Sequence, residues 1–185
     1  MHGRPRFRRG SRHGFTLVEL LIVVVIIGAA AAMAIPTFVS IDALRTRSAA
    51  QAIAGDILFA QSEAVAFQQQ RAIVFDTTNN TYTLVAVDGT TIDPATDALA
   101  KASGPGGRFE VSMSDQAFRG STISAPSFDG TNVLVFDALG TPVLRPGSDT
   151  PGAGGSVEIV GPEDRYRVLV SAFTGSVSVE RVPGP

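Results

Sequence analysis

Three hydrophobic patterns follow one another along the 185-residue chain. Residues 15–35 are almost all apolar, and Glu19 is the only charged residue among them. Residues 37–70 repeat apolar side chains three or four positions apart, which is typical of an amphipathic helix. After Arg71 the apolar period falls to about two, which indicates β-strands. This order predicts one long helix followed by a β-rich domain.

The first two patterns predict a single helix from about Phe15 to Gln69. Residues 37–70 contain one glycine, Gly55, and no proline, so little in them would interrupt a helix. At 1.5 Å per residue this helix would be roughly 80 Å long. We expect a kink at Pro36, where the apolar run ends. The apolar stripe of the second half would then pack on the domain that follows.

Segments with strand-like alternation follow the helix and are separated by turn signals. The expected strands are residues 72–76, 81–87, 108–113, 121–124, 132–137, 157–160, 166–171 and 176–181. Residues 93–107 and 145–155 are expected to be loops, because they are rich in Gly, Pro, Ser and Asp. We therefore predict an α+β fold in which the long N-terminal helix packs on an antiparallel β-sheet or sandwich.

Charge is distributed unevenly along the chain. Five of the 15 basic residues precede Gly14 and no acidic residue does, which leaves 10 basic and 17 acidic residues after it. A basic segment before an apolar run predicts a cytoplasmic N-terminus and an exported remainder. The acidic body argues against a general nucleic-acid surface, which needs clustered Lys and Arg. There is no cysteine, so the exported domain must rely on its core rather than on disulfides.

The start of the apolar run carries a specific spacing of residues. Gly14 is followed by an aromatic residue, Phe15, then by the carboxylate of Glu19, and later by Pro36. A carboxylate at membrane depth costs about 2.5–3.5 kcal/mol, so it normally has a partner. The spacing resembles the class III leader of type IV pilins and type II secretion pseudopilins. That resemblance implies cleavage after Gly14 by a prepilin peptidase, N-methylation of Phe15, and pairing of Glu19 with the N-terminal amine of a neighbouring subunit.

Two other interpretations of this segment remain open. An ordinary signal peptide has the same order of basic and apolar regions, and the tripeptide Ala32-Met33-Ala34 resembles its cleavage site. A signal anchor also fits, because residues 15–35 are about long enough to span a bilayer. Glu19 argues against the first interpretation, and the second leaves this carboxylate without a role.

Three downstream segments resemble the GspH/FimT family of minor pseudopilins and minor pilins. They are residues 59–64, 134–140 and 166–175. Members often have an arginine where this chain has Gln61, and a basic residue where it has Ser176. The resemblance divides the chain into a leader (1–14), a transmembrane and filament-core helix (15–36), an amphipathic half-helix (37–70) and a periplasmic β domain (71–185).

The residue types of the body do not favour catalysis. Both histidines, His2 and His13, precede Gly14, so the mature chain would lack the commonest general base and metal ligand. Lys101 is the only lysine and lies in a predicted loop. The carboxylates at positions 88, 93 and 97 could bind calcium, but their spacing is not that of an EF-hand loop, and we favour solvated turn residues. We expect no enzyme activity, cofactor or metal.

The resemblance implies a structural minor pseudopilin that assembles in the tip region of a periplasmic pseudopilus and drives protein secretion. Its expected partners are other pseudopilins or minor pilins, the prepilin peptidase, the inner-membrane assembly platform and secreted protein substrates. Its expected location before assembly is the bacterial inner membrane, with a single pass, a cytoplasmic N-terminus and a periplasmic C-terminal domain.

The main alternative is a FimT-type minor pilin that acts in pilus biogenesis or DNA uptake. DNA capture would need exposed basic residues, and the C-terminal arginines lie close in sequence to acidic residues. The arginines are Arg165, Arg167 and Arg181, and the acids are Glu163, Asp164 and Glu180. We therefore do not expect nucleic-acid binding. An exported enzyme and a signal-anchored binding domain are less favoured alternatives.

Overall fold

The structure is a computed structural model that describes residues 15–183, except for the side chains of residues 32–41. The chain forms two units that meet between residues 39 and 40. Gly14 lies outside the described residues, and so does the side chain of Pro36 with its predicted kink.

The described part of the first unit is the beginning of helix α1 (Leu17–Phe67). The helix begins at Leu17 because the hydroxyl oxygen of Thr16 accepts a hydrogen bond from the Glu19 backbone N–H at 3.2 Å, as an N-cap does. Every residue from 15 to 31 is exposed, although nearly all are apolar. Among the residues that the structure describes, no helix combines the length and apolar character needed to cross a membrane.

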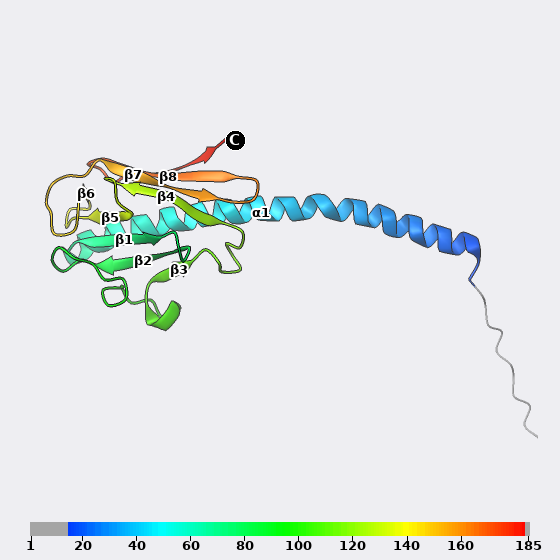
Figure 1. Cartoon of the computed structure of the whole chain (residues 1–185), viewed down its shortest axis with the longest axis horizontal. Coiled ribbons are helices and arrows are strands. Elements are labelled where there is room, and N and C mark those ends of the chain that lie inside the picture. Colours follow the sequence, from blue (N-terminus) through cyan, green and yellow to red (C-terminus); the bar gives the residue numbers. More distant parts are fainter. Residues whose placement is uncertain (1–14, 184–185) are drawn as a thin grey trace, which may run out of the picture. The chain divides into compact units, whose positions relative to one another are not determined.

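The second unit contains the C-terminal half of α1 and two antiparallel sheets (Figure 1). The helix ends at Phe67, two residues before the predicted end, because Gln68 adopts a left-handed backbone with φ of 53°. The buried face of this half carries small and β-branched residues. It consists of Ala49, Ala50, Ile53, Ile57, Ala60 and Ala64.

The first sheet has five strands in the order β3-β2-β1-β5-β6. Its strands are β1 (Arg71–Asp76), β2 (Thr81–Ala86), β3 (Glu110–Ser112), β5 (Val133–Phe136) and β6 (Pro142–Val143). One face packs on α1 through residues such as Phe75 and Leu84. The opposite face buries Val85 and Val135 beneath Ile92 of the loop that follows β2. Because both faces are covered, β1 and β2 lack the strict alternation of a half-exposed strand.

The second sheet has four strands in the order β4-β7-β8-β9. Its strands are β4 (Thr122–Phe128), β7 (Gly154–Val160), β8 (Arg165–Ser171) and β9 (Val177–Val182). Val157, Ile159 and Val168 belong to the same hydrophobic core as the buried face of α1 and the first sheet. A short 3-10 helix, η1 (Pro105–Gly107), lies between β2 and β3.

The predicted α+β fold is confirmed, and each of the expected strands is present within a few residues of its predicted bounds. The short strand β6 was not predicted, because the two residues Pro142 and Val143 show no periodic pattern. The division of the strands into two sheets was also not predicted, because it depends on pairing between distant segments.

Candidate assembly site

Two of the predicted N-terminal site residues, Phe15 and Glu19, lie at the start of α1. Phe15 is 75% exposed, and Glu19 lies in the first turn, one turn further along the chain. Thr16 and Glu19 occupy the N-cap and third helical positions, which is the residue pattern of a capping box. A carboxylate at this end of a helix interacts favourably with the helix dipole. The structure therefore places an exposed acidic group in the first turn of α1, four residues after Phe15.

Among the described side chains of the first unit, none covers the apolar surface around this carboxylate. The large residues Leu17, Ile22 and Ile27 are 81%, 50% and 62% exposed. Soluble monomers rarely leave so large an apolar surface in water, so this surface marks a site of interaction with apolar surroundings. Glu19 is the only charged residue among residues 15–31.

A separate feature of the second unit is Gln61 on α1, which the sequence marked only as a departure from the family pattern. Its side-chain Nε2 donates hydrogen bonds to the Gly140 carbonyl oxygen at 2.7 Å and to the Thr174 carbonyl oxygen at 3.1 Å. The two carbonyls belong to turns of different sheets. Gly140 and Gly175 both have positive φ, and a Cβ on Gly175 would lie 2.5 Å from Gln61 Nε2. Glutamine, like arginine, donates side-chain N–H groups, so either residue type could bond to two carbonyl oxygens here.

The C-terminal arginines lie on β8 and β9 and are paired with acidic residues. Arg167 contacts the Glu158 carboxylate at 2.6 Å and the Glu180 carboxylate at 3.4 Å. Arg165 contacts Glu158 at 3.6 Å, and Arg181 forms an ion pair with Asp164. These pairs reduce the positive charge that could attract phosphates.

The sequence did not indicate Glu158 as a partner of Arg167, because Glu158 lies on a different strand, β7. The antiparallel register places it directly opposite Arg167, and its carboxylate raises the pKa of that arginine. This partner could not be found by counting neighbours along the chain.

The aspartates near residue 93 are engaged in their own turn. Asp97 accepts a hydrogen bond from the Asp93 backbone N–H at 2.8 Å, and Asp93 accepts one from Ala95 N–H at 2.9 Å. Within the part of the chain that the structure describes, no group of three or more His, Cys, Asp or Glu residues is placed to hold a metal ion. These contacts fit the predicted turn role of the aspartates.

Two family models match the chain. The prokaryotic N-terminal methylation motif covers residues 9–35, and the type II transport protein GspH model covers residues 49–175, which is more than half of the chain. The chain belongs to the GspH family of type II transport proteins. The predicted family and the predicted pilin-type N-terminal motif are therefore confirmed, and so is a function as a GspH-type subunit in type II transport. This is a family of structural subunits rather than of known enzymes.

Solved structures of a minor pseudopilin and of a minor pilin are similar to the GspH-family chain. The minor pseudopilin EpsH of the Vibrio cholerae type 2 secretion system is 14% identical, with a TM-score of 0.48, over 74% of this chain and 97% of that chain. The type IV minor pilin FimU of Pseudomonas aeruginosa is 20% identical, with a TM-score of 0.47, over 77% and 92% of the two chains. No curated protein matches the sequence.

Proposed function

We propose that this GspH-family protein is a structural, non-enzymatic minor pseudopilin that assembles in the tip region of a periplasmic pseudopilus. Before assembly it is anchored in the inner membrane by residues 15–36, with the β domain in the periplasm. Part of this segment lies among residues whose side chains are outside the described structure. The single observation that carries the proposal is the exposed apolar start of α1, with the carboxylate of Glu19 as its only charge.

The proposed mechanism begins with processing of the leader. Prepilin peptidase cuts after Gly14, and the new amine on Phe15 is methylated. Before cleavage this nitrogen is part of a peptide bond, so the positive charge appears only in the mature chain. Processing thereby creates a cation at the start of an apolar helix.

Assembly then brings this cation and the Glu19 carboxylate of a neighbouring subunit together among apolar helices. An unpaired charge is strongly penalised in such surroundings, whereas a paired one is tolerated. The pairing therefore favours subunits in register over subunits displaced along the filament axis. The β domain remains free to contact other pseudopilins, the assembly platform or secreted proteins.

Processing can be tested by intact-mass measurement of the membrane-extracted protein. We expect a mature chain that begins at Phe15 and carries one additional methyl group. A chain that begins at Ile35, after the signal-peptide-like site, would refute the proposal and favour a secreted soluble domain.

Assembly can be tested with a single introduced cysteine, since the chain has none of its own. Ile22→Cys lies on the exposed apolar helix and should form disulfide crosslinks with neighbouring subunits that carry a cysteine in the same helix region. Adding Glu19→Ala should sharply reduce these crosslinks but leave the processed mass unchanged, whereas Glu19→Asp should restore part of them. Equal crosslinking with and without Glu19 would show that the carboxylate is dispensable.

The identity of the crosslinked partner distinguishes the proposed function from its alternative. Crosslinks to pseudopilins of a secretion system support the proposal. Crosslinks to pilins of a type IV pilus would instead assign the chain to pilus biogenesis or DNA uptake.

A further inference from the structure

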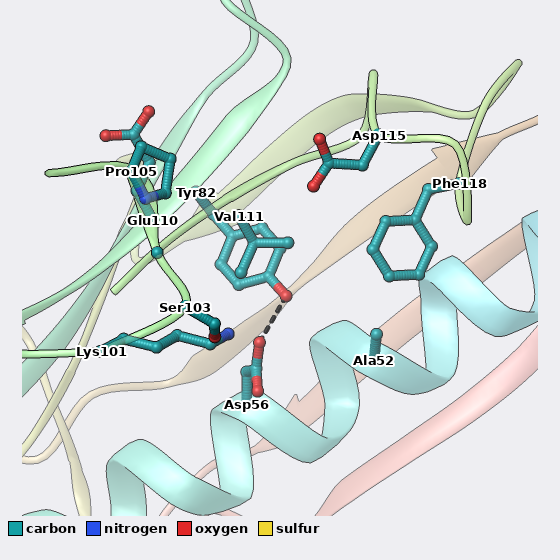
Figure 2. Close-up of a pocket in the computed structure, with 11 residues that line it drawn as sticks. Ala52, Asp56, Tyr82, Lys101, Ser103, Pro105, Glu110, Val111, Asp115 and Phe118 are labelled. Carbon is teal, nitrogen blue, oxygen red and sulfur yellow. Dashed lines mark hydrogen bonds between the residues drawn. The ribbon is translucent and has the colours of Figure 1, made fainter. Parts of the chain in front are cut away.

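A cavity of about 570 Å³ opens on the second unit between α1, β2, β3 and two loops (Figure 2). Its apolar walls include Ala52, Val111 and Phe118. Three carboxylates, those of Asp56, Glu110 and Asp115, also line it, together with the amine of Lys101. We call this cavity the acidic pocket.

The bottom of the acidic pocket is fixed by Tyr82, which is 1% exposed. Its hydroxyl donates a hydrogen bond to Oδ2 of Asp56 at 2.5 Å (Figure 2). Among the described residues, none donates a hydrogen bond to Oδ1 of Asp56. A buried tyrosine therefore holds the carboxylate in one orientation and leaves one of its oxygens available to a ligand.

The other charged residues of the pocket differ in whether they already have partners. Glu110 forms an ion pair with Arg108 at 3.1 Å, and the amine of Lys101 lies 4.0 Å from the centre of the Phe109 ring. Asp115 forms no ion pair with any described residue, and its carboxylate faces the cavity (Figure 2). The lining thus presents an excess of negative charge, and two of its carboxylates can accept further hydrogen bonds.

Burial of the Asp56 carboxylate also favours binding of a positively charged group beside it. It raises the pKa of this carboxyl group, because the charged form loses contact with water, although Tyr82 and Lys101 partly oppose the shift. A cation placed beside Asp56 would favour the charged form again.

The shape of the lining favours one type of cation. Phe118 and Val111 offer apolar contact for an aliphatic stem, and an aromatic ring face attracts a guanidinium group. A planar guanidinium has five N–H donors and can reach acceptors on more than one side, whereas a lysine amine is a compact point charge. Asp56 and Asp115 approach the cavity from α1 and from the loop after β3 (Figure 2).

We propose that the acidic pocket binds an arginine side chain presented by a partner protein. The proposal goes beyond the assembly role described above, because the pocket belongs to the second unit and uses neither Phe15 nor Glu19. The pocket would add specificity between β domains to the less selective packing of apolar helices.

The test is an NMR titration of the ¹⁵N-labelled full-length chain in detergent micelles. The probe is N-acetyl-arginine-methylamide, and the matched control is the citrulline analogue, which has the same shape but no charge. The arginine probe should shift the backbone amide signals of Tyr82, Lys101 and Asp115, and the citrulline probe should not. Equal shifts with both probes, or no arginine-selective shift at these residues, would overturn the proposal.

Variants test whether the two free carboxylates carry the binding. Asp115→Asn, an exposed change, should weaken binding of the arginine probe about fivefold. Asp56→Asn should do so at least as strongly, while its amide oxygen can still accept the Tyr82 hydrogen bond. The control is Asp149→Asn, which makes the same charge change on an exposed loop outside the pocket.

Two results with these variants and probes would contradict the proposal. If Asp149→Asn weakens binding as much as Asp115→Asn does, the effect is one of net charge and the proposal is wrong. A lysine analogue that binds more tightly than the arginine probe would also overturn it. The titration is independent of leader processing and of Glu19, so its failure would leave the proposed assembly function standing, and the reverse is equally true.

Discussion

Gln61 joins α1 to one turn of each sheet, so its replacement tests how the second unit is held together. The change to consider is Gln61→Ala. It removes a part-buried hydrogen bond of 2.7 Å to Gly140 and a more exposed one of 3.1 Å to Thr174. Both turns contain a glycine with positive φ.

The expected loss in the free energy of unfolding follows from these two hydrogen bonds. A net contribution of about 0.5–1.5 kcal/mol per hydrogen bond, with the buried bond near the upper value and the exposed bond near the lower, gives about 2 kcal/mol. For a domain of this size, that loss lowers the melting temperature by about 4–8 °C. Gln61→Glu should cost at least as much, because its carboxylate oxygens would face two carbonyl oxygens without a hydrogen to share. Gln61→Arg should retain most of the stability, since it restores N–H donors.

The assay is urea and thermal unfolding of a fragment containing residues 40–185, followed by circular dichroism. This unit contains its own hydrophobic core, so we expect it to fold without the first unit. Gln51→Ala is the matched control, because Gln51 is an exposed glutamine on the same helix. If the Ala and Glu variants at position 61 unfold like Gln51→Ala, the two hydrogen bonds contribute nothing and the reasoning is wrong.

Three further predictions concern other parts of the second unit. Because burial raises the folded-state pKa of Asp56 above its ordinary 3.8, the contribution of this group to the unfolding free energy is greatest below pH 3.8 and is lost as pH rises through the folded-state value. Asp56→Asn should therefore flatten that part of the stability profile, and an unchanged profile would contradict the assignment. In a denaturant titration, Gly130→Ala should lower the free energy of unfolding by roughly 1–3 kcal/mol through backbone strain alone. Gly154→Ala should lower it by more, because of these two glycines only Gly154 would place the new Cβ against backbone atoms. Equal losses of unfolding free energy would contradict the predicted clash. Gel-shift titration should show weak DNA binding that alanine changes at the paired C-terminal arginines do not reduce, and tight binding lost in these variants would restore the DNA-uptake alternative.

Local features of the sequence determined much of this protein. The apolar run with Glu19, the helical period up to residue 67 and the alternation of most strands are signals between near neighbours, and they predicted the long helix and the β-rich domain that follows. The N-terminal spacing and the downstream segments also predicted the GspH family. These features can be seen in the sequence because hydrophobic periodicity follows directly from backbone geometry.

Tertiary structure decided the features that depend on distant pairs. Gln61 bonds to residues 79 and 113 positions away, and no local pattern marks those turns as its partners. Arg167 meets Glu158 only because β7 and β8 pair in one register. The acidic pocket likewise collects Asp56 and Asp115 from α1 and a distant loop around a tyrosine buried by the core. Such contacts are set by how sheets and helix pack, which a one-dimensional pattern of polar and apolar residues does not specify.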